Sequence, residues 1–280
     1  MRYYVVLAML IAGYIALLPI MDGYSRERMN EKDVRYIPKN ELIDLSVLEF
    51  RTLAADIFFL NGLTFVGGHT GVVDPGEWEW LYKTLDASSY LNPYNIDPYF
   101  LAQGALTWFG KLYPETNALL ERGLAFRKKD WRIPFFIGFN YYYFLEEPEK
   151  GAHYIAMAAE TPDSPKTSLV ILSSRLYSQS QRTELAIAIV KDDYEKEREE
   201  NLRSMYKNRL ESLQNRMKIE KAVEAYEKHN KRKPLSLNVL VSKKYLNEIP
   251  ADPEGGTYFL DDRGKVENSN ETKTQKRWIK

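Results

Sequence analysis

Residues 130–165 read DWRIPFFIGFNYYYFLEEPEKGAHYIAMAAETPDSP, and they contain one structural repeat almost whole. Two helical segments are separated by a break at Glu147-Pro148, and Pro162 or Pro165 ends the unit. Small residues in both segments let two antiparallel helices approach closely, while aromatic residues fill the grooves between successive pairs. The pattern positions are Ile137, Gly138 and Tyr141 in the first segment and Gly151, Ile155 and Ala158 in the second. Because such a pair cannot bury its apolar face alone, the stretch predicts neighbouring pairs on both sides.

This order of positions resembles the tetratricopeptide repeat (TPR), whose helix A is large–small–aromatic and whose helix B is small–large–small before a closing proline. The resemblance implies an all-α solenoid of TPR-like helical hairpins over residues 46–193. Three to four repeats fit into this range, which is about the minimum for a stable stack. TPR stacks are scaffolds, and no catalytic set comes with the fold.

Capping residues mark the helix starts elsewhere in the repeat range. Ser46-x-x-Glu49 is a capping box, and it predicts a helix that runs to Gly68. Asp74-Pro75-Gly76-Glu77 predicts a second helix that ends at Asn92-Pro93, and Asp97-Pro98 starts the next one. The remaining helices are expected at 113–126, 166–179 and 183–190.

The composition changes after the repeats. Residues 194–233 are highly charged, with apolar residues at steps of three and four, which predicts one long amphipathic helix. We expect it to cap the solenoid; a coiled-coil partner site is the alternative. Residues 234–267 predict a short helix and a small β-hairpin, and the tail at 268–280 is expected to be disordered.

The composition argues against several classes of function. The 39 basic and 39 acidic residues give no net charge, which argues against a nucleic-acid binder. The chain has no cysteine, which removes disulfides, thiolate metal sites and covalent haem attachment. Its histidines, His69, His153 and His229, have no metal-ligand spacing. We therefore expect no metal, no cofactor and no catalytic residue, and we interpret the carboxylate pairs Glu146-Glu147 and Asp192-Asp193 as solvated.

The first residues predict a membrane anchor. No charged residue occurs from Tyr3 to Met21, and a helix of this length, at about 1.5 Å per residue, can cross the roughly 30 Å hydrocarbon core. We expect residues 1–22 to be an uncleaved transmembrane anchor and residues 23–45 to be a tether. A cleaved signal peptide and a buried core helix are the alternatives, although no A-x-A-like cleavage site follows. Positive charge before the span predicts a single-pass protein of the bacterial inner membrane, with its folded part in the periplasm.

Further segments extend the resemblance. FRTLAADIFFLNGL (50–63), LNPYNIDPYFLAQGALTWFGK (91–111) and IPADPEGGTYFLDDRGKV (249–266), together with the anchor, resemble a family of membrane-anchored bacterial TPR proteins. The last segment also resembles the carboxy-terminal hairpin of type II secretion major pseudopilins, which lies near a calcium site. That likeness implies a calcium ligand at Asp261 or Asp262; a plain turn is the alternative.

The leading functional hypothesis is a scaffold that binds protein partners of an envelope complex such as a pilus, secretion or transport system. The TPR resemblance implies a binding face lined by the A helices. The residues that it places there are Phe58, Asn61, Gln103, Thr107, Asn140 and Tyr143. A polysaccharide-binding protein is the alternative, with stacking platforms at Trp78, Trp80, Trp108, Trp131 and the aromatic run 141–144; the competing explanation is that these rings fill grooves between helices.

Overall fold

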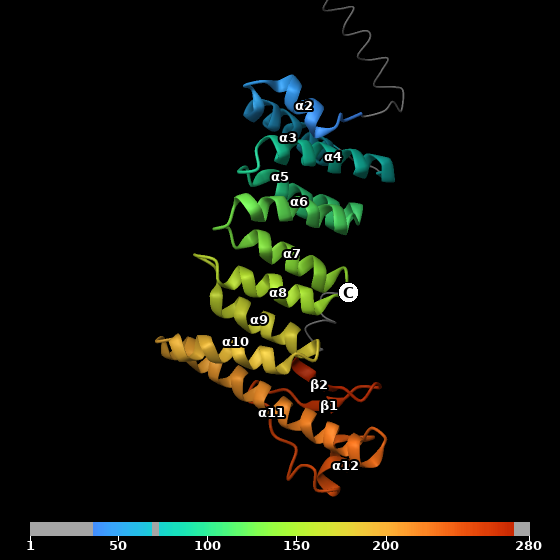
Figure 1. The fold of residues 1–280 in the computed structure, drawn as a ribbon, viewed down its shortest axis with the longest axis vertical. Helices are drawn as coiled ribbons and strands as arrows, with labels where there is room; N and C mark the ends of the chain where they lie inside the picture. Colours follow the sequence, from blue (N-terminus) through green and yellow to red (C-terminus); the bar gives the residue numbers. More distant parts are fainter. Residues whose placement is uncertain (1–35, 69–72, 272–280) are drawn as a thin grey trace, which may run out of the picture.

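The computed structural model describes residues 36–68 and 73–271, which form an elongated stack of helices with a two-stranded sheet near its far end (Figure 1). The elements are α2 (Asn40–Val47), α3 (Arg51–Gly68), α4 (Pro75–Leu91), α5 (Asp97–Leu101), the π-helix η1 (Ala102–Gly110), α6 (Tyr113–Phe126), α7 (Arg132–Tyr143), α8 (Pro148–Ala159), α9 (Lys166–Gln179), α10 (Thr183–Lys196), α11 (Glu200–Asn230), α12 (Leu237–Ser242), β1 (Tyr258–Leu260) and β2 (Val266–Asn268). The predicted all-α class is confirmed. The predicted anchor lies outside the described residues, and no helix within them is long and apolar enough to cross a membrane.

Successive helices pack on one another along the long axis of the molecule. Helix α3 contacts α4, and the series α6, α7, α8, α9, α10 continues with each helix against the next. Helix α11 runs obliquely across the end of this series; the β-hairpin lies alongside it, on the side of α10, and α12 lies near its C-terminal end (Figure 1). Apart from this terminal region, the fold is built from neighbours in sequence that are also neighbours in space.

Helices α7 and α8 approach closely at two of the small residues that define the repeat pattern. A Cβ added to Gly138 would lie 2.7 Å from Ile155 Cγ1 and 2.8 Å from the Gly151 carbonyl oxygen. A Cβ on Gly151 would lie 2.9 Å from the Gly138 carbonyl oxygen. The predicted close contact of these two helices is therefore confirmed, and it requires glycine on both sides.

Two main apolar clusters fill the stack. One lies between α3 and α7 and includes Leu85, Leu106 and Ile137, each fully buried. The other lies between α8 and α11 and includes Ile155 and Leu213. Burial of large apolar side chains at about 1.5–3 kcal/mol each is the main stabilising contribution along the stack.

The first helices differ from the prediction. Ser46 does not open a helix, because it lies inside α2, where its hydroxyl donates to the Ile43 carbonyl at 2.7 Å. The chain turns at Leu48, which has the left-handed φ of 49°, and α3 then begins at Arg51. The predicted tether also ends earlier than residue 45, because Ile43 of α2 is buried in a cluster with Leu91 of α4.

The capping box at Asp74 is confirmed. The Asp74 side chain accepts from the backbone N–H of Glu77, and the Glu77 carboxylate accepts from the Asp74 N–H at 3.1 Å. This box satisfies two backbone donors that the first turn of α4 would otherwise leave unpaired.

The C-terminal region agrees with the prediction except at its two ends. The long helix was expected from residue 194, but α10 continues to Lys196, with Val190 and Asp193 buried, and α11 begins only at Glu200. Helix α11 is one long helix, and the hairpin pairs Tyr258 with Asn268 and Leu260 with Val266. The expected disordered tail begins too early, because Asn268 lies in β2 and Glu271 is buried. Residues 272–280 lie outside the described part of the chain.

Gly138→Ala is expected to destabilise the stack, because its methyl group would overlap Ile155 and the Gly151 backbone. Overpacking of this kind costs about 1–3 kcal/mol. Gly104→Ala is the matched control, since a Cβ there would meet nothing within 4 Å. Urea unfolding followed by circular dichroism compares the two variants. An unchanged midpoint for Gly138→Ala would contradict the close approach of α7 and α8.

Candidate partner-binding surface

Three buried amides connect the helices in the middle of the stack. Gln103 of η1 and Asn140 of α7 exchange two hydrogen bonds: Gln103 Nε2 donates to Asn140 Oδ1 at 2.9 Å, and Asn140 Nδ2 donates to Gln103 Oε1 at 3.0 Å. Asn140 Nδ2 also donates to Asn117 Oδ1 of α6 at 2.8 Å. All three residues are buried. A buried network of this kind fixes the relative positions of its helices, because an amide left without its partner would be costly.

The structure corrects three of the six predicted partner-binding residues, two of them through this network. Gln103 and Asn140 were expected on an accessible face, but their amides are satisfied by each other inside the protein. Thr107 is fully buried as well. It lies in η1, whose wider i→i+5 turns shift side chains away from the positions that a regular α-helix would give them. None of these three residues can contact a partner at the surface.

The other three predicted residues lie in two separate places. Phe58 and Asn61 are both on α3, where Phe58 is half-buried against Ile43 and Asn61 is exposed. Tyr143 is half-buried at the end of α7, among other aromatic rings. The structure therefore does not bring the six residues together on one face.

An aromatic surface extends from η1 to the end of α7. We define it by Trp108, Phe109, Tyr113, Phe139, Tyr143 and Phe144. The Trp108 ring contacts three others, with centroid distances of 5.0 Å to Phe144, 5.8 Å to Tyr143 and 6.1 Å to Phe139. Trp108 is 49% exposed and Phe109 is 70% exposed, while the remaining rings are partly buried. Clustered, partly exposed rings of this kind are typical of binding surfaces.

The aromatic residues at the start of α7 and along it are regularly spaced, so their rings form one stripe along the helix. Trp131, Phe135, Phe139 and Tyr143 follow at intervals of four residues, which lie on one face of a helix. Their ring centroids are 6.0, 6.3 and 5.2 Å apart in sequence order, and the last pair is stacked. The stripe thus continues the aromatic surface toward the start of α7.

Ion pairs fix the backbone at the start of this stripe, where α7 begins. The Asp130 carboxylate accepts from Arg132 Nε at 2.7 Å and from Arg127 Nη2 at 3.0 Å. Arg132 in turn lies over the Phe100 ring, 5.0 Å from its centroid. The hydrogen bonds from Arg132, reinforced by that from Arg127, lower the pKa of the Asp130 carboxyl from 3.8 to about 2. Asp130 therefore ties the end of α6 to the start of α7.

A buried ion-pair cluster, which the sequence did not predict, joins α11 to the C-terminal segment. It consists of Arg209, Arg216, Glu254 and Glu271, and both arginines are 1% exposed. Glu271 accepts from Arg209 Nη1 and from Arg216 Nη1, each at 2.9 Å, and Glu254 accepts from Arg209 Nη1 at 3.0 Å. The available signal was the position of the arginines in the sequence. Tyr206, Arg209, Leu213 and Arg216 follow one another at three- and four-residue steps, so the arginines share the buried side of α11.

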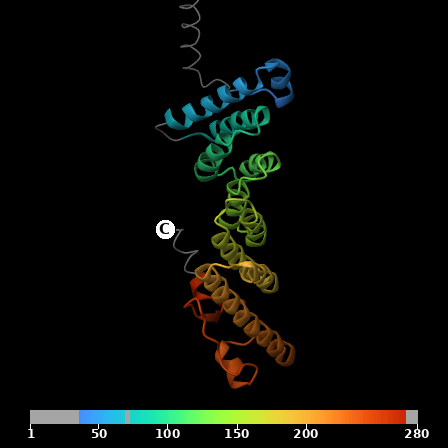
Figure 2. The ribbon, with the colours of Figure 1, turned by 90° about the vertical axis from the view of Figure 1, so that its left-hand side faces the viewer.

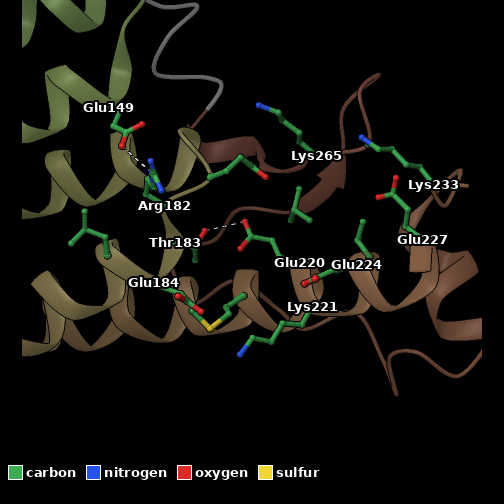
Figure 3. Close-up of a pocket in the computed structure, with 16 residues that line it drawn as sticks. Glu149, Arg182, Thr183, Glu184, Glu220, Lys221, Glu224, Glu227, Lys233 and Lys265 are labelled. Atoms are coloured by element: carbon green, nitrogen blue, oxygen red, sulfur yellow. Dashed lines mark hydrogen bonds and ion pairs between the residues drawn. The ribbon is translucent and has the colours of Figure 1, made fainter. Parts of the chain in front are cut away.

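A cleft of about 760 Å³ lies beside this cluster, between the start of α10, the middle of α11 and the hairpin (Figure 3). Its walls mix both signs of charge. Glu149 pairs with Arg182 at 2.9 Å, and Thr183 donates to Glu220 at 3.0 Å. The lining residues include no histidine, serine or aromatic residue.

Within residues 36–68 and 73–271, no group of His, Cys, Asp or Glu side chains is arranged to hold a metal ion. Asp261 Oδ1 instead accepts from the backbone N–H groups of Arg263 and Lys265, at 2.9 and 2.7 Å. This carboxylate closes the turn between β1 and β2.

Asp130→Asn is expected to destabilise the protein by about 1–2 kcal/mol at neutral pH, after allowing for the partial exposure of Arg132. Because the folded-state pKa of Asp130 is lowered, its contribution is complete above about pH 4 and is lost as the pH falls toward 2. The difference in stability between parent and variant should therefore shrink over this window. Denaturation at several pH values measures it, with exposed Asp262→Asn as control; a difference that is constant with pH would contradict the assignment.

Glu271→Gln is expected to cost about 3–5 kcal/mol, because it leaves two buried arginines without their shared carboxylate. The control is Glu211→Gln on the exposed side of α11, which should change stability by less than about 0.5 kcal/mol. Urea unfolding followed by circular dichroism at 222 nm distinguishes them. Similar midpoints for the two variants would show that the ion-pair cluster contributes little.

The aromatic surface is the candidate binding site, because it combines exposed rings with a buried hydrogen-bonded support. The cleft beside α11 is lined mainly by charged side chains of both signs and contains no cluster of rings. Comparisons with protein-family models, with curated proteins and with solved structures found no match for this chain. The candidate site is accordingly defined by the geometry of the chain itself.

Proposed function

We propose that this protein is a membrane-anchored scaffold that binds a protein partner through its aromatic surface. The anchor would be the uncharged stretch 3–21, and the folded part would lie in the periplasm of a bacterium. There the protein would help to assemble an envelope complex such as a pilus, secretion or transport system. The observation that carries the proposal is the group of partly exposed rings around Trp108.

The chemistry of this surface suits a protein partner. Aromatic residues are enriched at the centres of protein interfaces, where a few of them supply most of the binding energy. Trp108 is half exposed and is supported on three sides by Phe139, Tyr143 and Phe144. A ring held in this way loses little conformational freedom on binding, so more of the interaction energy remains for affinity.

The buried amides strengthen the same argument. Gln103 and Asn140 connect η1 directly to α7, the two elements that supply most of the aromatic surface. Because these hydrogen bonds fix the helices relative to each other, the rings are presented in one arrangement before a partner arrives. The resemblance of residues 130–165 to a TPR supports a scaffold role independently of the rings.

Polysaccharide binding is the second candidate, since sugar rings also stack on exposed aromatics. A sugar site needs polar groups converging beside the stacking ring to bind the hydroxyls. The amides of Gln103, Asn117 and Asn140 are instead buried and bonded to one another. This observation favours the protein partner.

Photocrosslinking in the bacterium that carries the protein tests the proposal. A photoreactive residue at Phe109, which is 70% exposed, is expected to capture one dominant protein. The same residue at Phe126 is the control, because Phe126 is 48% exposed but lies on α6 outside the aromatic surface. Trp108→Ala should lower the capture at position 109 by about tenfold or more, as expected for a hot-spot side chain.

Capture that is equal at positions 109 and 126, or that is unchanged by Trp108→Ala, would contradict the aromatic surface as the binding site. Adducts at position 109 that contain carbohydrate and no protein would favour the polysaccharide candidate instead.

A further inference from the structure

The N-terminal end of the stack carries a second apolar surface, separate from the aromatic one. We define this apolar face by Leu42, Leu45, Leu48, Phe50, Leu53, Ile57, Leu60 and Leu63. Each of these side chains is between 44% and 76% exposed. Figure 2 shows their helices, α2 and α3, in blue at the end of the stack that is farthest from α12. Soluble surfaces rarely gather this many large apolar side chains without using them for binding.

The apolar face is additional to the surface that α3 uses for folding. Ala55, Gly62 and Phe65 are buried on the side of α3 that packs against the stack. A Cβ at Gly62 would lie 3.2 Å from both Leu81 and Leu85 of α4, so the two helices are already closely packed there. The outward side chains of α3 are thus not required for the contact with α4, and the rest of residues 36–68 and 73–271 leaves them uncovered.

Charged groups are few on this side of α3: Asp56 is half-buried, and the exposed Glu41 and Glu49 lie beside the face, outside α3. The exposed positions between Thr52 and Gly68 carry only apolar residues, threonine, asparagine and glycine. The rim of an ordinary protein interface is polar and charged, whereas a surface that enters the acyl region of a bilayer must avoid charge. The composition of α3 therefore fits a lipid surface better than a water-exposed protein rim.

The short connection to the N-terminal stretch indicates that the apolar face is near the membrane. The uncharged stretch 3–21 and the first described residue, Tyr36, are separated by the 14 residues 22–35. A chain of this length spans at most about 50 Å when fully extended. If residues 3–21 cross the bilayer, the end of the stack that carries the apolar face therefore stays within about 50 Å of the membrane, close enough to reach its surface.

We propose that the apolar face of α2 and α3 lies on the periplasmic surface of the membrane, with its leucine and isoleucine side chains among the upper acyl chains. The inference rests on the membrane anchoring in the proposed function. The protein would then contact the membrane twice, through the transmembrane anchor and through α2 and α3. The aromatic surface, on η1 and α7, would then remain available to a partner.

The absence of cysteine from the chain allows a direct test with the full-length protein. Leu53→Cys and Leu60→Cys are labelled separately with the fluorophore NBD, and the protein is reconstituted into vesicles of phosphatidylethanolamine and phosphatidylglycerol. We expect blue-shifted emission that is quenched by nitroxides on the lipid acyl chains. Leu235→Cys, which is 94% exposed and lies between α11 and α12, is the control and should be neither shifted nor quenched.

A label at Ile11→Cys reports on the anchor separately. Quenching at Ile11 without quenching at Leu53 and Leu60 would overturn the docking of α2 and α3 while leaving the anchor intact. Quenching at Leu53 and Leu60 without quenching at Ile11 would support the docking and contradict the anchor. Labels at Leu53→Cys and Leu60→Cys that are blue-shifted but escape the nitroxides would overturn the inference. If the same variants, left unlabelled and treated with an oxidant, form a disulfide between two chains, a second copy covers the face.

A charge substitution provides an independent readout. With the label at Ile57→Cys, the double substitution Leu53→Asp and Leu60→Asp should reduce nitroxide quenching several-fold, because two carboxylates cannot enter the acyl region without a large cost. Leu185→Asp on α10 is the matched control, since Leu185 is also partly exposed but lies far from α3. Equal quenching in the two variants would contradict the docking.

Discussion

The close approach of α7 and α8 at Gly138 and Gly151 is the contact on which the middle of the stack depends. With no side chain between the backbones, the rotation of α7 about its axis is fixed. That rotation turns Asn140 inward, to within hydrogen-bonding distance of Gln103, and leaves Phe139 and Tyr143 partly exposed. The buried amide network and the aromatic surface are consequences of the same helix orientation.

Much of the fold could be predicted because the residues that start and end its helices act locally. Glycines, prolines and the Asp74 capping box act within a few residues of their own position, and the helices from α4 onward were placed by them. The failure at Ser46 has a tertiary cause. Burial of Ile43 against Leu91 keeps residues 40–47 helical, so the residue pattern at 46–49 is overridden by a contact with a distant helix.

The candidate site was less predictable, because residue type alone does not show which hydrogen-bond or ion-pair partner a polar side chain has in the folded protein. Gln103 and Asn140 belong to a class that is usually exposed, yet each satisfies the other. Arg209 and Arg216 resembled the solvated charges common on amphipathic helices. Their carboxylate, Glu271, lies more than one structural element away in sequence, so periodicity alone could not identify the pair.

The buried ion-pair cluster also gives the chain a direction of assembly. Most helices of the stack contact partners that are close in sequence, so their loops close at little entropic cost. The contacts of the C-terminal segment with α9 are different: Arg175 and Glu254 are 79 residues apart, and Ser178 and Glu271 are 93 residues apart. Such contacts become favourable only once the intervening helices have formed. We therefore expect α9, α10, α11 and the β-hairpin to close late, as one unit, whereas the earlier helices can form by addition to their neighbours.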